Sequence, residues 1–435
     1  MNSPFLSNMS HAFGFFILLA VLGLLTGCRE TAVSQPTTNE ITLEALLDDA
    51  ANQPVAKELR EEDLPGRLAE SGANEDDLEN RPTEAVRLPV IPTPTPTPAP
   101  IRAIGVNYAH VSASRSEVPA LQAYAAAVGV NMVGLNAGRP DWAYFRWQEH
   151  PEYWSSAVRS SSIDFLAEDT LNFRTGGLAN VHINAMIDIY APNYIAAHPE
   201  TAAISYWGEA SPLLVSTAAL ASGPFHDLVL EMIAAIAANY PVDSISITEL
   251  SYRIYGYGPD DLALYRAHTG RDDWPRSRNG VILFEHPSIG EWRSAALAGF
   301  LAKAAAIAQA HGKELFFDVE VSWGDLANEG GEYGHDYATL LTAVNRIIVW
   351  GYTDLAGYPP AYAGEIATYL AERYQPEQII LSVGLWGPNG TVMAAEEMAT
   401  AVAAIQTSAI PHVWITPTSL LTADHWEKLL PAAHD

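Results

Sequence analysis

The feature that most constrains this chain is an alternation, from Ile101 onward, of short β-branched runs with longer Ala- and Leu-rich stretches. The β-branched runs predict strands, and the stretches between them have the apolar spacing of helices. Eight strands are expected, at Arg102–Tyr108, Asn131–Asn136, Asn180–Tyr190, Val242–Glu249, Glu314–Trp323, Arg346–Tyr352, Gln378–Trp386 and His412–Thr416. Helices are expected at Val118–Val128, His226–Asn239, Trp292–His311, Tyr362–Tyr374 and Ala394–Gln406, with Trp426–Leu430 closing the set.

Strands that alternate with helices form parallel sheets, and eight such units are typical of a (β/α)8 TIM barrel. We therefore predict an α/β fold in which residues 101–435 form the barrel. A doubly wound open sheet is the alternative. It is disfavoured because the first expected strand is followed by Ala109-His110-Val111-Ser112 rather than by a glycine-rich phosphate loop.

The N-terminus carries a second strong signal. Residues 13–25 form an apolar run that is short for a membrane span and of the length of a signal-peptide core. The run ends in Leu25-Thr26-Gly27-Cys28, which resembles the bacterial lipobox. The resemblance implies a signal peptide at 1–27, a lipid on Cys28 and a place at the cell membrane on the extracytoplasmic side. The alternative is an uncleaved helix with a buried cysteine.

Residues 28–100 differ in composition from the rest of the chain. They are rich in Glu, Asp, Thr and Pro and poor in aromatic residues, so we expect a disordered tether. The tether ends in an alternating Pro-Thr run at 92–100, which predicts a polyproline II spacer. The net charge of −28 disfavours nucleic acid as a partner, and a single cysteine excludes a disulfide scaffold.

In several expected strands, polar residues occupy the alternate positions that face the barrel interior. Alternation in the fifth strand puts Leu315, Phe317 and Val319 toward the helices and Asp318 and Glu320 toward the barrel interior. The same parity gives the polar or aromatic interior residues Asn107, His182, Asn184, Asp188, Ser244, Ser246, Thr248, Trp350 and Tyr352. Glu249 follows at the end of the fourth strand. Interior polar groups are costly unless paired, so they indicate a site, although a structural role is the alternative for each.

Aromatic residues cluster where the expected strands end. They include Tyr190, Tyr252, Trp323, Trp350, Tyr352 and Trp386. Their flat faces suit the C–H faces of sugar rings, and packing of loops over the barrel is the alternative. Functional residues of barrels usually lie at this end.

The stretch His198–Tyr255 carries a resemblance. It contains His198-Pro199-Glu200, then a Gly223-Pro224 helix start, then a strand that reads YPVDSISITELSY over 240–252. It resembles the glycoside-hydrolase-like barrels of the "family 10 glycosylhydrolase" group, in which such a strand leads to one or two acids before an aromatic residue. Trp292-Arg293, the 317–321 strand and RIIVWGYTD at 346–354 fit the same layout. In this chain Thr248 takes the place of the first acid, and the seventh strand ends in Gly384-Leu385-Trp386 without an acid.

The resemblance implies a lipid-anchored glycoside hydrolase that acts on a poly- or oligosaccharide. Glycoside hydrolysis needs two carboxyl groups across the scissile bond. We expect Glu320 to be the general acid, with its pKa raised by enclosure and by Asp318, and Glu249 to be the base or nucleophile. The two roles are interchangeable at this level. No cofactor and no metal are expected.

Two other classes of function stay open. Thr248 suggests a non-catalytic carbohydrate-binding lipoprotein that kept a degenerate hydrolase barrel. A metal-dependent hydrolase would use His182 and Asp188, but no pair at metal-ligand spacing lies on one strand. The acidic, glycine-rich run Glu329–Asp336 is either a calcium loop or, as we expect, a solvated loop.

Overall fold

The structure is a computed structural model that describes residues 99–107, 117–175 and 178–430. The expected signal peptide, Cys28 and all but the last two residues of the expected tether lie outside the described residues. Within the described ranges, none of the helices combines the length and the hydropathy that a membrane crossing needs.

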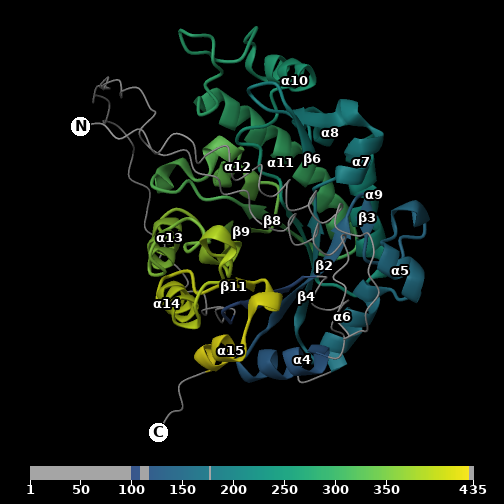
Figure 1. The fold of residues 1–435 in the computed structure, drawn as a ribbon, viewed down its shortest axis with the longest axis vertical. Coiled ribbons are helices and arrows are strands. Elements are labelled where there is room, and N and C mark those ends of the chain that lie inside the picture. Colours follow the sequence, from purple (N-terminus) through teal and green to yellow (C-terminus); the bar gives the residue numbers. More distant parts are fainter. Residues whose placement is uncertain (1–98, 108–116, 176–177, 431–435) are drawn as a thin grey trace, which may run out of the picture. The chain divides into compact units, whose positions relative to one another are not determined.

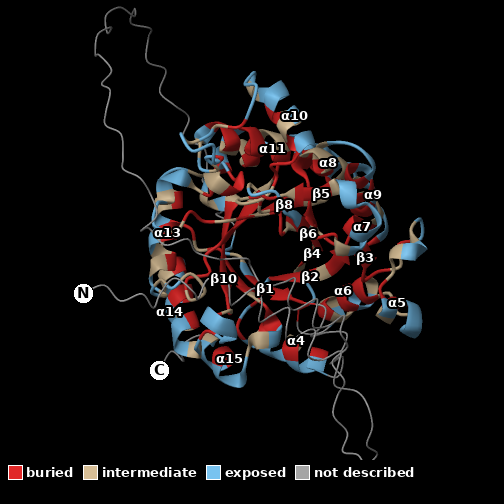
Figure 2. Ribbon diagram, turned by 45° about the horizontal axis from the view of Figure 1, so that its top comes forward, coloured by how far each residue is buried: buried red, intermediate tan, exposed pale blue. Residues whose placement is uncertain are grey.

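Parallel strands form the centre of the fold. They are β1 (Arg102–Val106), β2 (Met132–Arg139), β4 (His182–Asp188), β7 (Ser244–Thr248), β8 (Glu314–Val319), β9 (Arg346–Trp350), β10 (Ile379–Gly384) and β11 (Val413–Thr416). They pair in chain order, and β1 pairs with both β2 and β11, so the sheet closes on itself. The (β/α)8 barrel is thereby confirmed, and the open sheet is wrong. Figure 2 shows the strands as a buried ring surrounded by helices whose outer sides are exposed.

The main helices lie outside the barrel (Figure 1). They are α4 (Val118–Ala127), α6 (Phe165–Thr175), α9 (Pro224–Asn239), α11 (Pro287–Ala310), α13 (Tyr362–Ala371), α14 (Ala395–Gln406) and α15 (Ala423–Leu429). Shorter elements fill the connections, namely β3 (Trp142–Ala143), α5 (Ser156–Ser161), α7 (Pro192–Ala197), β5 (Ala202–Ile204), β6 (Ala210–Val215), α8 (Thr217–Ala221), α10 (Pro259–Thr269) and α12 (Tyr337–Leu341). Both α9 and α11 begin at a proline, whose fixed φ suits the first helical position.

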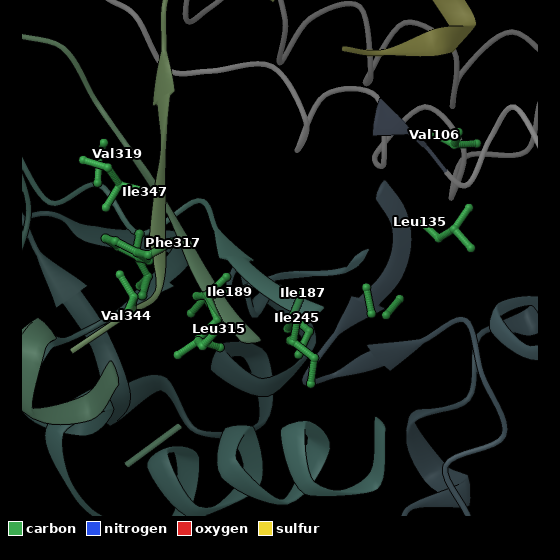
Figure 3. Close-up of a cluster of buried hydrophobic side chains, with 14 of the residues drawn as sticks. Val106, Leu135, Ile187, Ile189, Ile245, Leu315, Phe317, Val319, Val344 and Ile347 are labelled. Carbon is green, nitrogen blue, oxygen red and sulfur yellow. The ribbon is translucent and has the colours of Figure 1, made fainter. Parts of the chain in front are cut away.

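Side chains of β8 alternate between two apolar layers. Leu315, Phe317 and Val319 belong to the large core between strands and helices, part of which Figure 3 shows. Phe316 belongs to a separate cluster inside the barrel, with Ala103, Met132, Ile348, Ile380 and Trp414. A fully buried side chain of this size contributes about 1.5–3 kcal/mol, so a one-residue slip of β8 would be costly. The side chains of β8 therefore face the helices and the barrel interior in the predicted alternation.

Polar residues of β4 and β7 satisfy one another in the lower part of the interior. The Asn184 amide donates to the Ser244 hydroxyl at 2.8 Å and accepts from the Ser246 hydroxyl at 2.7 Å. His182 Nε2 lies 2.7 Å from the same Ser244 hydroxyl. Buried polar groups paired in this way avoid the cost of unmet hydrogen bonds.

Candidate active site

Two acids lie at the ends of the adjacent strands β4 and β7. Asp188 is the last residue of β4 and pairs in register with Thr248, the last residue of β7. Glu249 is the next residue and has a φ of 64°, so the chain turns in the left-handed region as it leaves the strand. Such a conformation is uncommon for a non-glycine residue and costs free energy that the surrounding fold must offset.

Two further acids lie at the end of β8, which pairs with β7. Asp318 has the parity of the interior residue Phe316. Glu320 follows Val319, the last residue of the strand. Because the strands are parallel, the three strand ends meet at one end of the barrel, and four acids gather there.

Glu249 is buried and has acidic neighbours. The residue is only 7% exposed. Burial raises the pKa of Glu249 well above its usual range, and the negative charges of Asp188, Glu320 and Asp318 raise it further. A hydrogen bond from the Tyr190 hydroxyl opposes this shift. Burial and acidic neighbours therefore favour the protonated form of Glu249 relative to an exposed glutamate.

The carboxyl groups of Asp318 and Glu320 are enclosed by the protein, and the pKa of each lies near neutrality. Burial raises the pKa of Asp318 to about 7, and hydrogen bonds from Trp350 and Thr248 oppose the shift. Burial raises the pKa of Glu320 to about 7, against a hydrogen bond from Ser251. Groups that titrate near the working pH are suited to proton transfer.

Charges beyond the strand ends also act on Glu320. The charge of Glu332 raises its pKa, and the charge of Arg253 lowers it. The sequence did not assign Arg253, Glu332 or Ser251 to the group of acids, although Glu332 belongs to the acidic run considered as a calcium loop. They lie in the loops after β7 and β8, where no periodicity assigns a side chain to a face. For Ser251 and Arg253, closeness in sequence to Glu249 is the signal that could have pointed to the site.

The predicted aromatic residues at the ends of β9 and β10 come together. The rings of Trp350 and Tyr352 are stacked with centroids 5.5 Å apart, and the Trp386 ring lies 5.4 Å from that of Tyr352. Trp323, after β8, packs against Tyr358 at 5.1 Å. Trp323 and Trp386 are partly exposed. Trp350, which bonds Asp318, and Tyr352, which lies near three of the acids, therefore begin an aromatic wall that continues to Trp386.

Several buried polar atoms at the same end have no protein partner. They include Oδ1 of Asn107, the residue after β1, Oδ1 of Asp318 and Oγ1 of Thr353. Buried atoms of this kind normally find a partner, so each calls for a water or a ligand group. This supports a polar ligand at the carboxyl end of the barrel.

Three predicted substrate-binding residues lie elsewhere. His182 is the first residue of β4, at the amino end of the barrel, where its ring stacks on Phe316 at 6.2 Å. Asn184 is fully buried in the interior network below the acids. Tyr252 is completely buried in the core outside the barrel. The structure does not bring these three side chains to the group of acids.

No cluster of three or more His, Cys, Asp or Glu side chains suited to a metal ion occurs in the described part of the chain. His182 and Asp188 lie at opposite ends of β4, so they do not share a site. The run Glu329–Asp336 is engaged in protein contacts instead, because Glu329 accepts from Tyr374 and Glu332 from Ser322.

Comparisons with known proteins support the fold. The glycoside hydrolase domain of PgaB (BpsB) from Bordetella bronchiseptica has a TM-score of 0.59 at 13% identity, covering 76% of this chain and 97% of that chain. A β-galactosidase from Marinomonas ef1 has a TM-score of 0.51 at 11% identity, covering 76% and 58%. The β-amylase catalytic domain from Paenibacillus polymyxa has a TM-score of 0.50 at 13% identity, covering 75% and 95%. No family model matches the sequence, and a comparison with curated proteins found no match.

Proposed function

We propose that this chain is a glycoside hydrolase that cleaves a poly- or oligosaccharide with Glu249 and Glu320. The observation that carries the proposal is the pair of carboxyl groups with raised pKa at the ends of the adjacent strands β7 and β8. Two carboxyl groups are the machinery that glycoside hydrolysis requires, and raised pKa values let one of them hold a proton at neutral pH.

The environments of Glu249 and Glu320 favour different catalytic roles for the two acids. Glu249 is the more buried and has three acidic neighbours, so it is the better proton donor. Glu320, with a pKa of about 7, ionises more readily and serves as base or nucleophile. This exchanges the roles expected from sequence. Asp318 is the third candidate catalytic residue, and its charge helps to keep Glu249 protonated.

The substrate follows from the surroundings of the acids. The aromatic side chains of Trp323, Trp350, Tyr352 and Trp386 suit the C–H faces of sugar rings. Fold neighbours are named as a glycoside hydrolase domain, a β-galactosidase and a β-amylase, which supports a carbohydrate substrate. No cofactor is needed for this chemistry.

The test is hydrolysis of a panel of polysaccharides by the purified protein, read as release of reducing ends. We expect Glu249→Gln and Glu320→Gln each to lower kcat by about 10²–10⁴-fold. Asp273→Asn removes an exposed acid of an ion pair with Arg276, and it should leave kcat unchanged. Hydrolysis that survives both glutamate substitutions would refute the proposal. The anomer released then separates retention, at a carboxyl spacing of about 5 Å, from inversion, at about 6.5–9.5 Å.

A non-catalytic carbohydrate-binding protein is the second candidate. Thr248 favours it, because it stands where the resemblance implies an acid. Binding of an oligosaccharide without release of reducing ends, unaffected by both glutamate substitutions, would select this candidate.

We also propose that Cys28 carries a lipid that anchors the protein at the extracytoplasmic side of the cell membrane. The apolar run before Leu25-Thr26-Gly27-Cys28 supports this. Radiolabelled palmitate should enter the wild-type protein but not Cys28→Ser, and Cys28→Ser should leave the membrane fraction. Equal labelling of both would contradict the anchor.

A further inference from the structure

His335 connects the two strand ends that bear Glu249 and Glu320. Its Nδ1 lies 2.9 Å from the backbone nitrogen of Glu320, and its Nε2 lies 2.7 Å from the carbonyl oxygen of Leu250. The amide can only donate and the carbonyl can only accept, so the neutral tautomer with hydrogen on Nε2 satisfies both. The residue is 1% exposed, and burial lowers the pKa of His335 to about 4, so the ring stays neutral at working pH.

The sheet itself does not hold either acid. The ladder between β7 and β8 ends at the pair Ile247 and Phe317, and the two strands end at Thr248 and Val319. Glu249 and Glu320 lie just beyond these ends. Beyond the last ladder hydrogen bonds, the His335 imidazole therefore joins the two strand ends. It bonds the backbone of Glu320 on one side and the backbone of Leu250, next to Glu249, on the other.

The segment that carries His335 is itself firmly held. Tyr337 donates its hydroxyl hydrogen to the Glu320 carbonyl, so both backbone polar groups of Glu320 are bonded to this segment. The Gly330 amide donates to the Ser322 hydroxyl at 2.8 Å. A Cβ at Gly330 would lie 2.6 Å from the Glu320 carbonyl oxygen, so the close approach requires glycine.

Aromatic contacts fix the ring from the sides. The His335 ring meets Phe317 edge to face at 5.5 Å and stacks on Tyr333 at 6.2 Å. With both nitrogens bonded and both sides packed, the ring has one orientation. A rigid bridge of this kind can set a distance between two backbones.

We infer that His335 is a positioning residue, which sets the spacing of the Glu249 and Glu320 carboxyl groups by joining the ends of β7 and β8. The inference rests on the proposed function of these two acids. It gives the glycine-rich run Glu329–Asp336 a role as a strap over the strand ends, in place of the calcium loop considered from sequence.

Three substitutions separate the two hydrogen bonds. His335→Asn keeps an acceptor near the place of Nδ1 and so retains the bond to Glu320. His335→Gln keeps a donor near the place of Nε2 and so retains the bond to Leu250. His335→Phe keeps the ring and loses both bonds. The matched control is His425→Phe, because His425 is also buried, accepts from the Thr422 amide at Nδ1 and bonds the Met393 carbonyl at Nε2, but lies on α15.

We expect His335→Gln and His335→Phe to lower kcat by about 10²-fold, since a displacement near 1 Å has an effect of this size. KM should change much less, and the limbs of the pH–rate profile should move. His335→Asn loses the bond to Leu250 and therefore breaks the bridge as well, so it should lower kcat in the same way. His425→Phe should lose stability with an unchanged pH–rate profile. Equal kcat and pH–rate profiles in all four variants would overturn the inference.

A second readout does not depend on hydrolysis. Carboxyl carbon-13 NMR can follow the titration of Glu249 and Glu320, with each signal assigned by its glutamine variant. Loss of the bridge should let water reach the strand ends, so both pKa values should fall toward their ordinary range in His335→Gln and stay unchanged in His425→Phe. If the wild type hydrolyses nothing, the proposed function fails and this titration alone decides the inference. Unchanged titrations in His335→Gln would overturn it.

Discussion

The indole Nε1 of Trp350 donates a hydrogen bond of 3.1 Å to Oδ2 of Asp318, across the pair of strands β9 and β8. The other carboxylate oxygen of Asp318 is buried without a protein partner. Together with Thr248, the indole therefore stabilises the charged form of an acid that burial pushes toward the protonated form. The tryptophan thus links the aromatic wall to the electrostatics of the acids.

Replacing this tryptophan by phenylalanine should raise the pKa of Asp318 further. A hydrogen bond to the charged form lowers a pKa, and Trp350→Phe removes the donor but keeps a ring. The cost should be about 1–3 kcal/mol at pH 8, where Asp318 is charged, and smaller at pH 5. Urea unfolding at both pH values, together with the Asp318 carboxyl titration, measures this. Trp386→Phe is the control, and an equal loss at both pH values would contradict the prediction.

The raised pKa values of Asp318 and Glu320 also predict how stability depends on pH. In the folded state both groups hold a proton up to about pH 7, whereas the unfolded chain releases it near 4. The folded state therefore binds more protons between these limits, so stability falls as pH rises from about 4 to about 7. Asp318→Asn and Glu320→Gln should raise the unfolding midpoint at pH 8 and have little effect at pH 4.

An exposed acid should show the opposite dependence of stability on pH, and it serves as the control. Hydrogen bonding to Arg276 lowers the pKa of Asp273, so its contribution is present at neutral pH and is lost as the pH falls through the folded pKa. Asp273→Asn should therefore lower the midpoint slightly at pH 8. Thermal unfolding of the three variants from pH 4 to pH 8 tests both signs, and a midpoint for Asp318→Asn below that of the wild type at pH 8 would be the contrary result.

The polar network inside the barrel should contribute to stability rather than to chemistry. Asn184→Ala leaves the hydroxyl groups of Ser244 and Ser246 without their amide partner. Unmet buried groups cost about 1–3 kcal/mol, which urea unfolding should show directly. Thr170→Val is the matched control, because the Thr170 hydroxyl is buried without a partner and its removal should be neutral or stabilising. Equal effects of the two substitutions would refute this account.

The strands of the barrel could be predicted because their periodicity is strong. In β8 the apolar Leu315, Phe317 and Val319 alternate with Phe316 and Asp318, and only one register buries the apolar set. The hairpin of β5 and β6 was not predicted. Its strands are short, its register is irregular and β6 contains a proline, so the period that reveals a strand is too weak.

The site could be predicted only in part, for a related reason. Parity assigns a residue to a face of a strand but says nothing of depth along the barrel, so His182 and Asn184 were grouped with Asp188 although they lie below it. Beyond the strand end even parity is lost. Tyr252 lies only three residues after Glu249, and the sequence pattern could not predict that it is completely buried in the core. The bonds that hold Glu320 come from residues 335 and 337, which only the folded loop brings there.

The aromatic wall should determine substrate affinity more than rate. Trp386 is partly exposed and packs against Tyr352, so Trp386→Ala removes a flat surface without uncovering the core. Loss of such a contact should cost about 0.5–1.5 kcal/mol of binding, which raises KM or the Kd for an oligosaccharide by roughly two- to tenfold. Because the surface binds ground state and transition state alike, kcat should change little. Trp207→Ala is the control, since Trp207 is exposed between β5 and β6. An unchanged Kd in Trp386→Ala, or an equal rise in both variants, would show that the ring only packs the loops.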